Sequence, residues 1–259
     1  MQLFNKGLKK KKPGYWNNYQ TWEEALLDSD GYDFDIIIKK VTNSSLKVKN
    51  GVAAFERDSV IFDSIYHSWP VVSFLLQNII NYNNELRIID FGGSLGSTYF
   101  ACKTFFPKKI NIKWGIVEQE KFVNIGKEYF QTDELSFYYS LEEAQERIVP
   151  NVLFLGSSLP YIKEPYELLE RIFQFSISDI IIDRTAVLLG YDDRITLQVV
   201  PPEIYDASYP AWFFNENKLL SSFNNASYQL IADFDAIGKT ITLEDCTAQS
   251  KGFLFKKKY

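Results

Sequence analysis

A short glycine-rich stretch follows an apolar run at residues 86–91. It holds Gly92, Gly93 and Gly96, and Asp90 stands directly before it. Glycine allows a tight turn and lets the backbone approach a ligand that a Cβ atom would exclude. A strand, a glycine turn and the start of a helix, in that order, are typical of a site for part of a nucleotide. The stretch therefore predicts a nucleotide-like ligand at the end of a strand.

The spacing of the glycines discriminates between nucleotide classes. A dinucleotide-binding turn has the pattern G-x-G-x-x-G. Counted from Gly92, its second and third glycine positions hold Ser94 and Ser97, which disfavours an NAD-dependent oxidoreductase. The pattern that fits is D-x-G-x-x-x-G, formed by Asp90, Gly92 and Gly96.

A second chemical group stands at the end of the next apolar run. Glu118 closes the run at 112–118, which contains Trp114 and Ile116. A carboxylate at that position can accept hydrogen bonds from both hydroxyls of a ribose. The alternative is a surface carboxylate at a strand end, and we favour the ribose.

Two residues are candidate general bases. His67 is the only histidine, and imidazole is the side chain that titrates near neutrality without a shift; its alternative role is a hydrogen-bonded helix residue. Asp183 ends an apolar run beside Arg184, whose guanidinium would lower the pKa of Asp183 and make it a poorer base. Arg184 is also suited to bind a phosphate, or to pair with Asp183 for structure alone.

The elements that position these residues alternate regularly after residue 85. The expected strands are 86–91, 112–118, 135–139, 151–156 and 179–183. The expected helices are 97–106, 120–130, 141–148 and 165–175. Such alternation predicts an α/β, Rossmann-like, doubly wound sheet of seven mostly parallel strands with helices on both faces. Ligands of such sheets lie at the carboxyl ends of the strands, where the strand order reverses.

The segment before the sheet predicts a different organisation. Residues 1–14 are basic and are expected to be flexible, and residues 15–85 to form a mostly helical cap. Thr21 and Glu24 have capping-box spacing, which predicts a helix over 22–27. The aromatic residues just before it either pack the segment onto the body or border the substrate pocket. Residues 35–48 are compatible with a helix or an extended arm. Residues 59–82 have helical spacing, interrupted by Pro70.

The core is expected to span 86–259 and to include a long connection at 185–212, which predicts a lid. A helix at 213–223 and strands at 227–235 and 250–257 would follow. The connection carries Tyr205, Tyr209 and Trp212. Such aromatic side chains either stack on a sugar face or seal the lid.

Composition restricts the class of protein. A net charge of −5 over 259 residues disfavours a nucleic-acid binder. The two cysteines have no paired spacing, so we expect neither a disulfide framework nor a zinc site, and a reducing cytoplasm fits. No apolar run reaches about 20 residues, and no signal peptide is expected. A monomer and a homodimer both remain open.

The turn and Glu118 together resemble the class I methyltransferases that use S-adenosylmethionine (SAM). The resemblance narrows to a branch associated with bacterial surface-polysaccharide biosynthesis and covers about residues 15–255. The stretches that carry it are WEEA at 22–25, DFGGSLG at 90–96, VEQ at 117–119, LPYI at 159–162, DRT at 183–185 and ASYPAW at 207–212. This copy has Ser94 where the family often has glycine. It also lacks the usual acid near residue 140, although Glu142 is close.

The resemblance implies a set of site residues. The turn would wrap the methionine and ribose end of the cofactor, residues 139–141 would lie near adenine, and the loop at 156–161 would pass the sulfonium. The implied cofactor-binding residues are Asp90, Gly92, Gly93, Ser94, Gly96, Glu118, Gln119, Ser140, Ser157 and Leu159. The catalytic candidates are His67, Asp183 and Tyr161, and the substrate-binding candidates are Arg184, Tyr205, Tyr209 and Trp212.

The implied activity is SAM-dependent methyl transfer to a small-molecule acceptor, with S-adenosylhomocysteine (SAH) as product and no metal. The expected acceptor is a sugar nucleotide or another precursor of a bacterial surface glycan, in capsule or lipopolysaccharide. O-methylation is preferred because a candidate base is present. N-methylation of an amine-bearing glycan precursor or a phosphorylated amino alcohol is the alternative, and a non-catalytic SAM-binding module is another.

Overall fold

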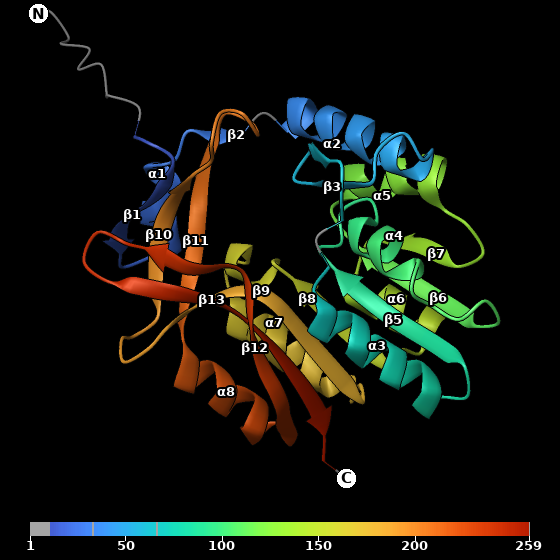
Figure 1. The fold of residues 1–259 in the computed structure, drawn as a ribbon. Coiled ribbons are helices and arrows are strands. Elements are labelled where there is room, and N and C mark those ends of the chain that lie inside the picture. The colour runs from blue at the N-terminus through green and yellow to red at the C-terminus, as the bar shows by residue number, and fades with distance from the viewer. Residues whose placement is uncertain (1–10, 33, 66, 259) are drawn as a thin grey trace, which may run out of the picture.

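An eleven-stranded sheet forms the centre of the computed structural model (Figure 1). The structure describes residues 11–32, 34–65 and 67–258. The first ten residues of the expected flexible segment at 1–14 lie outside this part of the chain. No helix within the described ranges is long and apolar enough to span a membrane.

Five neighbouring strands of the sheet are parallel. In spatial order they are β7 (Leu135–Tyr138), β6 (Asn111–Val117), β5 (Glu85–Phe91), β8 (Val152–Gly156) and β9 (Asp179–Leu188). The first strand in sequence, β5, therefore lies between β6 and β8, and the strand order reverses there. The expectation of a Rossmann-like parallel sheet with the glycine turn at its switch point is confirmed.

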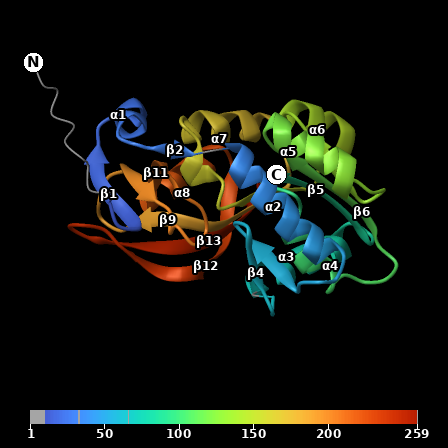
Figure 2. The same ribbon diagram turned by 90° about the horizontal axis from the view of Figure 1, so that it is seen from above.

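Helices cover both faces of these strands, as Figure 2 shows for α6 and α7 on one side and α3 and α4 on the other. The helices that follow β5 are α4 (Ser97–Lys103), α5 (Glu120–Ile125) with the π-helix η1 (Gly126–Phe130), α6 (Leu141–Ile148), α7 (Pro165–Gln174) and α8 (Glu216–Asn225). Successive side chains of a strand point to opposite faces. Phe154 therefore packs in the core under α3 and α4, whereas Leu153 packs in the core under α6 and α7.

Two local signals before the sheet have clear outcomes. The helix α1 (Trp22–Leu27) has the expected bounds, and its capping box between Thr21 and Glu24 is present. The helical spacing expected over 59–82 is wrong before residue 69, where β4 (Val60–Phe62) lies, and Pro70 marks the helix boundary: it lies in the first turn of α3 (Trp69–Asn81), where no helical N–H is required. The undecided segment at 35–48 belongs to the helix α2 (Phe34–Lys49).

The remaining strands correct the rest of the expected architecture. The antiparallel strand β13 (Thr247–Lys257) joins β9 to β12 (Tyr228–Thr242). The expected lid at 185–212 is instead part of the sheet, since β9 continues to Leu188 and is followed by β10 (Arg194–Val199) and β11 (Ala207–Asn215). The next helix accordingly begins at Glu216 rather than at residue 213.

The N-terminal segment contains short strands as well as the helices α1, α2 and α3. Its strands β1 (Gly14–Tyr19) and β2 (Gly31–Tyr32) pair with β10 and β11. Its hairpin of β3 (Phe55–Arg57) and β4 (Val60–Phe62) stands apart from the large sheet, and α3 belongs to the central core. Together with β10 and β11, the strands β1 and β2 raise the number of strands in the large sheet from the expected seven to eleven. A pairing between β1 and β10 joins segments too distant in sequence for a local pattern to indicate.

Candidate functional site

The glycine turn is held tightly against the loop that follows β8. Gly92 has a φ of 74°, and its N–H donates to the carbonyl of Val117 at 2.9 Å. A Cβ atom added to Gly92 would lie 2.6 Å from the Cβ atom of Ser158. Both the backbone angle and the close approach therefore require glycine here.

Asp90 supports this turn from below. A Cβ atom on Gly93 would lie 2.5 Å from Cγ of Asp90, so the carboxylate lies directly against the backbone of the turn. The carboxylate accepts a hydrogen bond from Nε1 of Trp114 at 3.1 Å and is 1% exposed. Burial raises the pKa of Asp90 to about 7. The structure thus places Asp90 under the turn rather than at its open side.

Glu118 lies beside the turn, as the sequence predicts. Its Oε1 accepts from the backbone N–H of Ser94 at 3.2 Å, and its Oε2 accepts from that of Gln119 at 2.8 Å. Ser94 has a φ of 54°, which is a left-handed conformation. Burial raises the pKa of Glu118. Two backbone donors therefore orient the carboxylate, and lone pairs remain for further donors.

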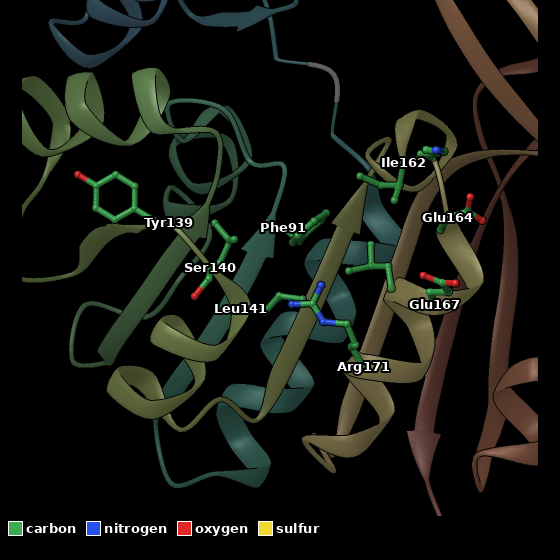
Figure 3. Close-up of a pocket in the computed structure, with 11 residues that line it drawn as sticks. Phe91, Tyr139, Ser140, Leu141, Ile162, Glu164, Glu167 and Arg171 are labelled. Carbon is green, nitrogen blue, oxygen red and sulfur yellow. The ribbon is translucent and has the colours of Figure 1, made fainter. Parts of the chain in front are cut away.

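A cavity of about 390 Å³ opens beside the carboxyl ends of β5 and β6 (Figure 3). Its lining includes Phe91, Val117, Ser140, Leu141, Ile162 and Arg171. The hydroxyl of Ser140 accepts from the N–H of Glu143 and so caps α6 at the edge of this cavity. The side chain of Leu159 is fully buried in the core, which leaves only its backbone for a ligand.

A β-bulge lies in the middle of β9, beside the end of β8. Thr185 pairs with Lys251 and Ile182 with Phe253, so Asp183 and Arg184 together oppose a single residue of β13. Arg184 has a φ of 55°. Bulges and left-handed non-glycine residues are concentrated near functional sites, where they redirect side chains.

The bulge brings Asp183 and Arg184 into contact. Nη1 of Arg184 lies 3.3 Å from Oδ2 of Asp183, and Nη2 donates to the carbonyl of Gly156 at 3.2 Å. Asp183 is 2% exposed, and its Oδ1 has no hydrogen-bond partner among the described residues. Burial raises the pKa of Asp183, and Arg184 opposes that shift. The expectation of a lowered pKa is wrong because desolvation outweighs the neighbouring charge.

His67 faces the same small cavity as Asp183. This cavity of about 100 Å³ is also lined by Ser68 and Asp235. The imidazole ring packs edge-on against Phe105 with centroids 4.5 Å apart, and its buried Nδ1 has no partner among the described residues. Desolvation lowers its pKa. The structure therefore brings the two candidate bases together.

A row of polar side chains crosses the added strands. Tyr15, Gln198 and Tyr209 are direct neighbours on β1, β10 and β11. The hydroxyl of Tyr161, in the 3-10 turn η2 (Leu159–Tyr161), donates to Oε1 of Gln198 at 2.9 Å, and the Tyr161 ring packs edge-on against Tyr209. The hydroxyls of Tyr205 and Tyr209 are 3.5 Å apart.

The protonation state of Tyr161 and the position of Trp212 on its strand restrict the roles that these two candidates can have. Burial raises the pKa of Tyr161 well above its ordinary value, so its phenol is a hydrogen-bond donor and not a base near neutrality. Trp212 lies three positions after Tyr209 on β11 and hence on the other face of the strand. It stacks there on Trp22, with centroids 6.4 Å apart. The structure does not group Trp212 with the tyrosines.

Ser157 and Glu56 also lie near the carboxyl ends of the parallel strands. The backbone N–H of Ser157, whose φ is 63°, donates to the carbonyl of Asp183 at 2.8 Å. Glu56 of β3, which no sequence motif indicates, is 2% exposed and accepts from the hydroxyl of Ser97 at the start of α4.

Within the described ranges, no three His, Cys, Asp or Glu side chains are grouped to hold a metal ion.

No protein-family model and no curated protein sequence matches the chain. In three dimensions it is similar to the N-terminal domain of EvdMO1, solved in the presence of SAH and D-fucose. The TM-score is 0.50 at 12% identity, over 85% of this chain and 97% of that one. The same domain with SAH bound matches at a TM-score of 0.50 and 11% identity, with the same coverage.

A SAM-dependent methyltransferase from Clostridium acetobutylicum is also similar, with a TM-score of 0.46 at 10% identity. The match covers 75% of this chain and 93% of that one. A structure named as a SAM-dependent methyltransferase and a domain solved with SAH bound are thus both among the structural neighbours. At such low identities the likeness to the EvdMO1 domain shows a common fold.

Proposed function

We propose that this protein is a SAM-dependent methyltransferase that acts on a small-molecule acceptor. The observation that carries the proposal is the convergence of the glycine turn and the oriented carboxylate of Glu118 at the switch point of the sheet. The fold supports it, because a similar domain was solved with SAH bound.

The residues of this edge fit the parts of the cofactor. Glu118 would hold the ribose, and the cavity beside Ser140 and Leu141 would take the adenine. The turn from Gly92 to Gly96, with the loop at Ser157, would face the methionine end. Bound there, SAM supplies an electrophilic methyl group. The protein must supply the position of the acceptor and, for a hydroxyl, a group that takes its proton.

We propose Asp183 as that proton acceptor, with His67 beside it on the same cavity. The free Oδ1 of Asp183 and its raised pKa make it a stronger base than an exposed carboxylate. Tyr161, whose O–H donates to Gln198, would orient the acceptor by accepting a hydrogen bond at its phenol oxygen. Such a base favours O-methylation over N-methylation of an unprotonated amine, which needs no dedicated base.

The proposed acceptor is a sugar nucleotide or another precursor of a bacterial surface glycan. Arg184 offers a guanidinium beside the proposed base, and Tyr205 and Tyr209 offer phenol hydroxyls and a ring face beside Tyr161, which together would suit a sugar that carries phosphate. The similar EvdMO1 domain was solved in the presence of D-fucose. We further propose that the protein works in the cytoplasm, which its free cysteines Cys102 and Cys246 support.

Calorimetry with SAM and SAH tests the cofactor, and a transfer assay on sugar nucleotides, glycans and amino alcohol phosphates tests the reaction. Asp183→Asn should lower kcat by about 100-fold or more and leave the Kd of SAH unchanged, since proton transfer contributes on that scale. His67→Asn tests the neighbouring base in the same assay. Absence of SAM and SAH binding would overturn the proposal. Binding without turnover would point to a non-catalytic SAM-binding module.

A further inference from the structure

The hairpin of β3 and β4 holds Glu56 in a fixed position. Arg57 pairs with Val60, so the two strands are joined by Asp58 and Ser59 alone. Both have positive φ values, of 52° and 68°, as a two-residue type I′ turn requires. A tight hairpin of this kind has little freedom to move Glu56 away from α2 and α4, against which β3 packs.

The carboxylate of Glu56 is buried and only half satisfied. Its Oε1 accepts from the hydroxyl of Ser97, the residue that directly follows Gly96 of the turn. Its Oε2 is buried and has no hydrogen-bond partner among the described residues. Oγ of Ser45, on α2, is also buried, and its hydroxyl faces the carboxylate of Glu56 as a donor. A hydroxyl that donates in this way keeps lone pairs, so Oε2 of Glu56 and Oγ of Ser45 can both accept from a further donor.

No basic side chain compensates this carboxylate within the described ranges, where the ion pairs all involve other acids. Burial raises the pKa of Glu56, and the hydroxyls of Ser97 and Ser45 and the backbone of Ser59 oppose the shift. A buried carboxylate without a partner is costly. A cation that carries N–H donors would remove that cost by pairing with the free oxygen.

We propose that Glu56 binds the α-ammonium group at the amino acid end of the cofactor, with Ser45 as a second acceptor. The inference rests on the proposed function. SAM has two cationic groups, and only the ammonium has N–H donors, because the sulfonium has none. Glu56, on β3, contacts the first residue of α4, and Ser45, on α2, faces Glu56. This contact is next to the turn that would face the methionine end. Glu56 thereby selects a cofactor that keeps its amine.

A double-mutant cycle between protein and ligand tests this pairing. Calorimetry would measure the Kd of SAH and of its desamino analogue, in which hydrogen replaces the amine, for the wild type and for Glu56→Gln. The wild type should prefer SAH by about tenfold or more, and Glu56→Gln should lose that preference while binding the analogue about as well as the wild type. Asp179→Asn is the matched control, because Asp179 is also a buried carboxylate but lies at the opposite end of β9.

The outcomes separate the two proposals. If the wild type binds neither ligand, the proposed function fails and the inference falls with it. If the wild type binds SAH and Glu56→Gln keeps the full preference for the amine, the inference alone is overturned. Thermal unfolding without ligand checks that each variant folds. If Glu56→Gln does not fold, Glu56→Asp replaces it in the same cycle, since the shorter carboxylate should also lose part of the preference.

Discussion

The two halves of the proposed site are built in different ways. The cofactor half is centred on one stretch of sequence, from Asp90 to Glu118, and the main contacts within that stretch are made by backbone amides and a tight turn. The proposed acceptor half is drawn from distant segments, since His67 and Asp183 line one small cavity and Tyr161 contacts Gln198, and its groups are side chains. Backbone recognition requires particular backbone angles and empty space, whereas side-chain recognition requires that several elements be placed correctly.

The difference indicates how each half responds to change. In the cofactor half, an added methyl group should weaken SAH binding strongly and the loss of a hydroxyl should weaken it little, because the donors are N–H groups. In the acceptor half, the reverse is expected, because hydroxyl and carboxyl groups make the contacts. The predictions below contrast these two responses, from the largest expected effect to the smallest.

Gly92→Ala should have the largest effect. The new Cβ atom would clash with Ser158 and force a φ that alanine avoids, so SAH binding should weaken by about 1,000-fold, or about 4 kcal/mol. Gly190→Ala is the matched control, because Gly190 has a φ of 78° with nothing within 4 Å of an added Cβ atom. Calorimetry and thermal unfolding would measure both variants. Equal SAH affinities for the two variants would contradict the close-approach argument.

The same contrast explains what the sequence could reveal. The turn, Glu118 and the five central strands follow from local patterns, since glycine spacing and apolar runs lie within short windows. The position of Tyr209 beside Gln198 depends on the pairing of β10 with β11. Glu56 reaches the site because the hairpin packs on α4, and no pattern around it records that contact. Local chemistry was therefore predictable, and long-range assembly was not.

Asp90→Asn should change the pH dependence of stability. Folding raises the pKa of Asp90 from 3.8 to about 7, so its contribution is fully present below about pH 4 and is lost as the pH rises through about 7. The loss amounts to about 4 kcal/mol at most. Thermal unfolding from pH 5 to 8 should show a smaller decline for Asp90→Asn than for the wild type. If the stabilities of the two proteins changed with pH in parallel, Asp90 would already be ionised at pH 5. The other carboxylates with raised pKa values are present in both proteins, so their contributions cancel when the two curves are subtracted.

Glu118→Gln should weaken SAH binding by about 30-fold, or about 2 kcal/mol. Each carboxylate oxygen of Glu118 faces a backbone N–H, so the amide group of glutamine would set its NH2 against one of those donors. Glu120→Gln, on the exposed start of α5, is the control. Calorimetry would compare the two variants. A wild-type Kd for Glu118→Gln would remove the carboxylate from the proposed ribose site.

Tyr161→Phe should act on the acceptor half alone. Loss of the hydroxyl that donates to Gln198 should raise the KM for the acceptor by about fivefold, or about 1 kcal/mol, and leave the Kd of SAH unchanged. Tyr166→Phe, which removes the hydroxyl bonded to Asp193, provides a control on α7. Steady-state kinetics with a turned-over acceptor would separate KM from kcat. A changed SAH affinity with an unchanged KM would place Tyr161 in the cofactor half instead.

Ser94→Gly should have the smallest effect and gives the sharpest contrast with Gly92→Ala. Ser94 holds a left-handed φ of 54°, and glycine adopts that angle freely, so stability should rise by about 0.5 kcal/mol after the entropy of glycine is counted. The N–H that donates to Glu118 is retained, so the Kd of SAH should stay within about twofold. Calorimetry and thermal unfolding measure both quantities. A large loss of affinity would show that the Ser94 hydroxyl contacts the cofactor, and the glycine turn itself would then bind through a side chain as the acceptor half does.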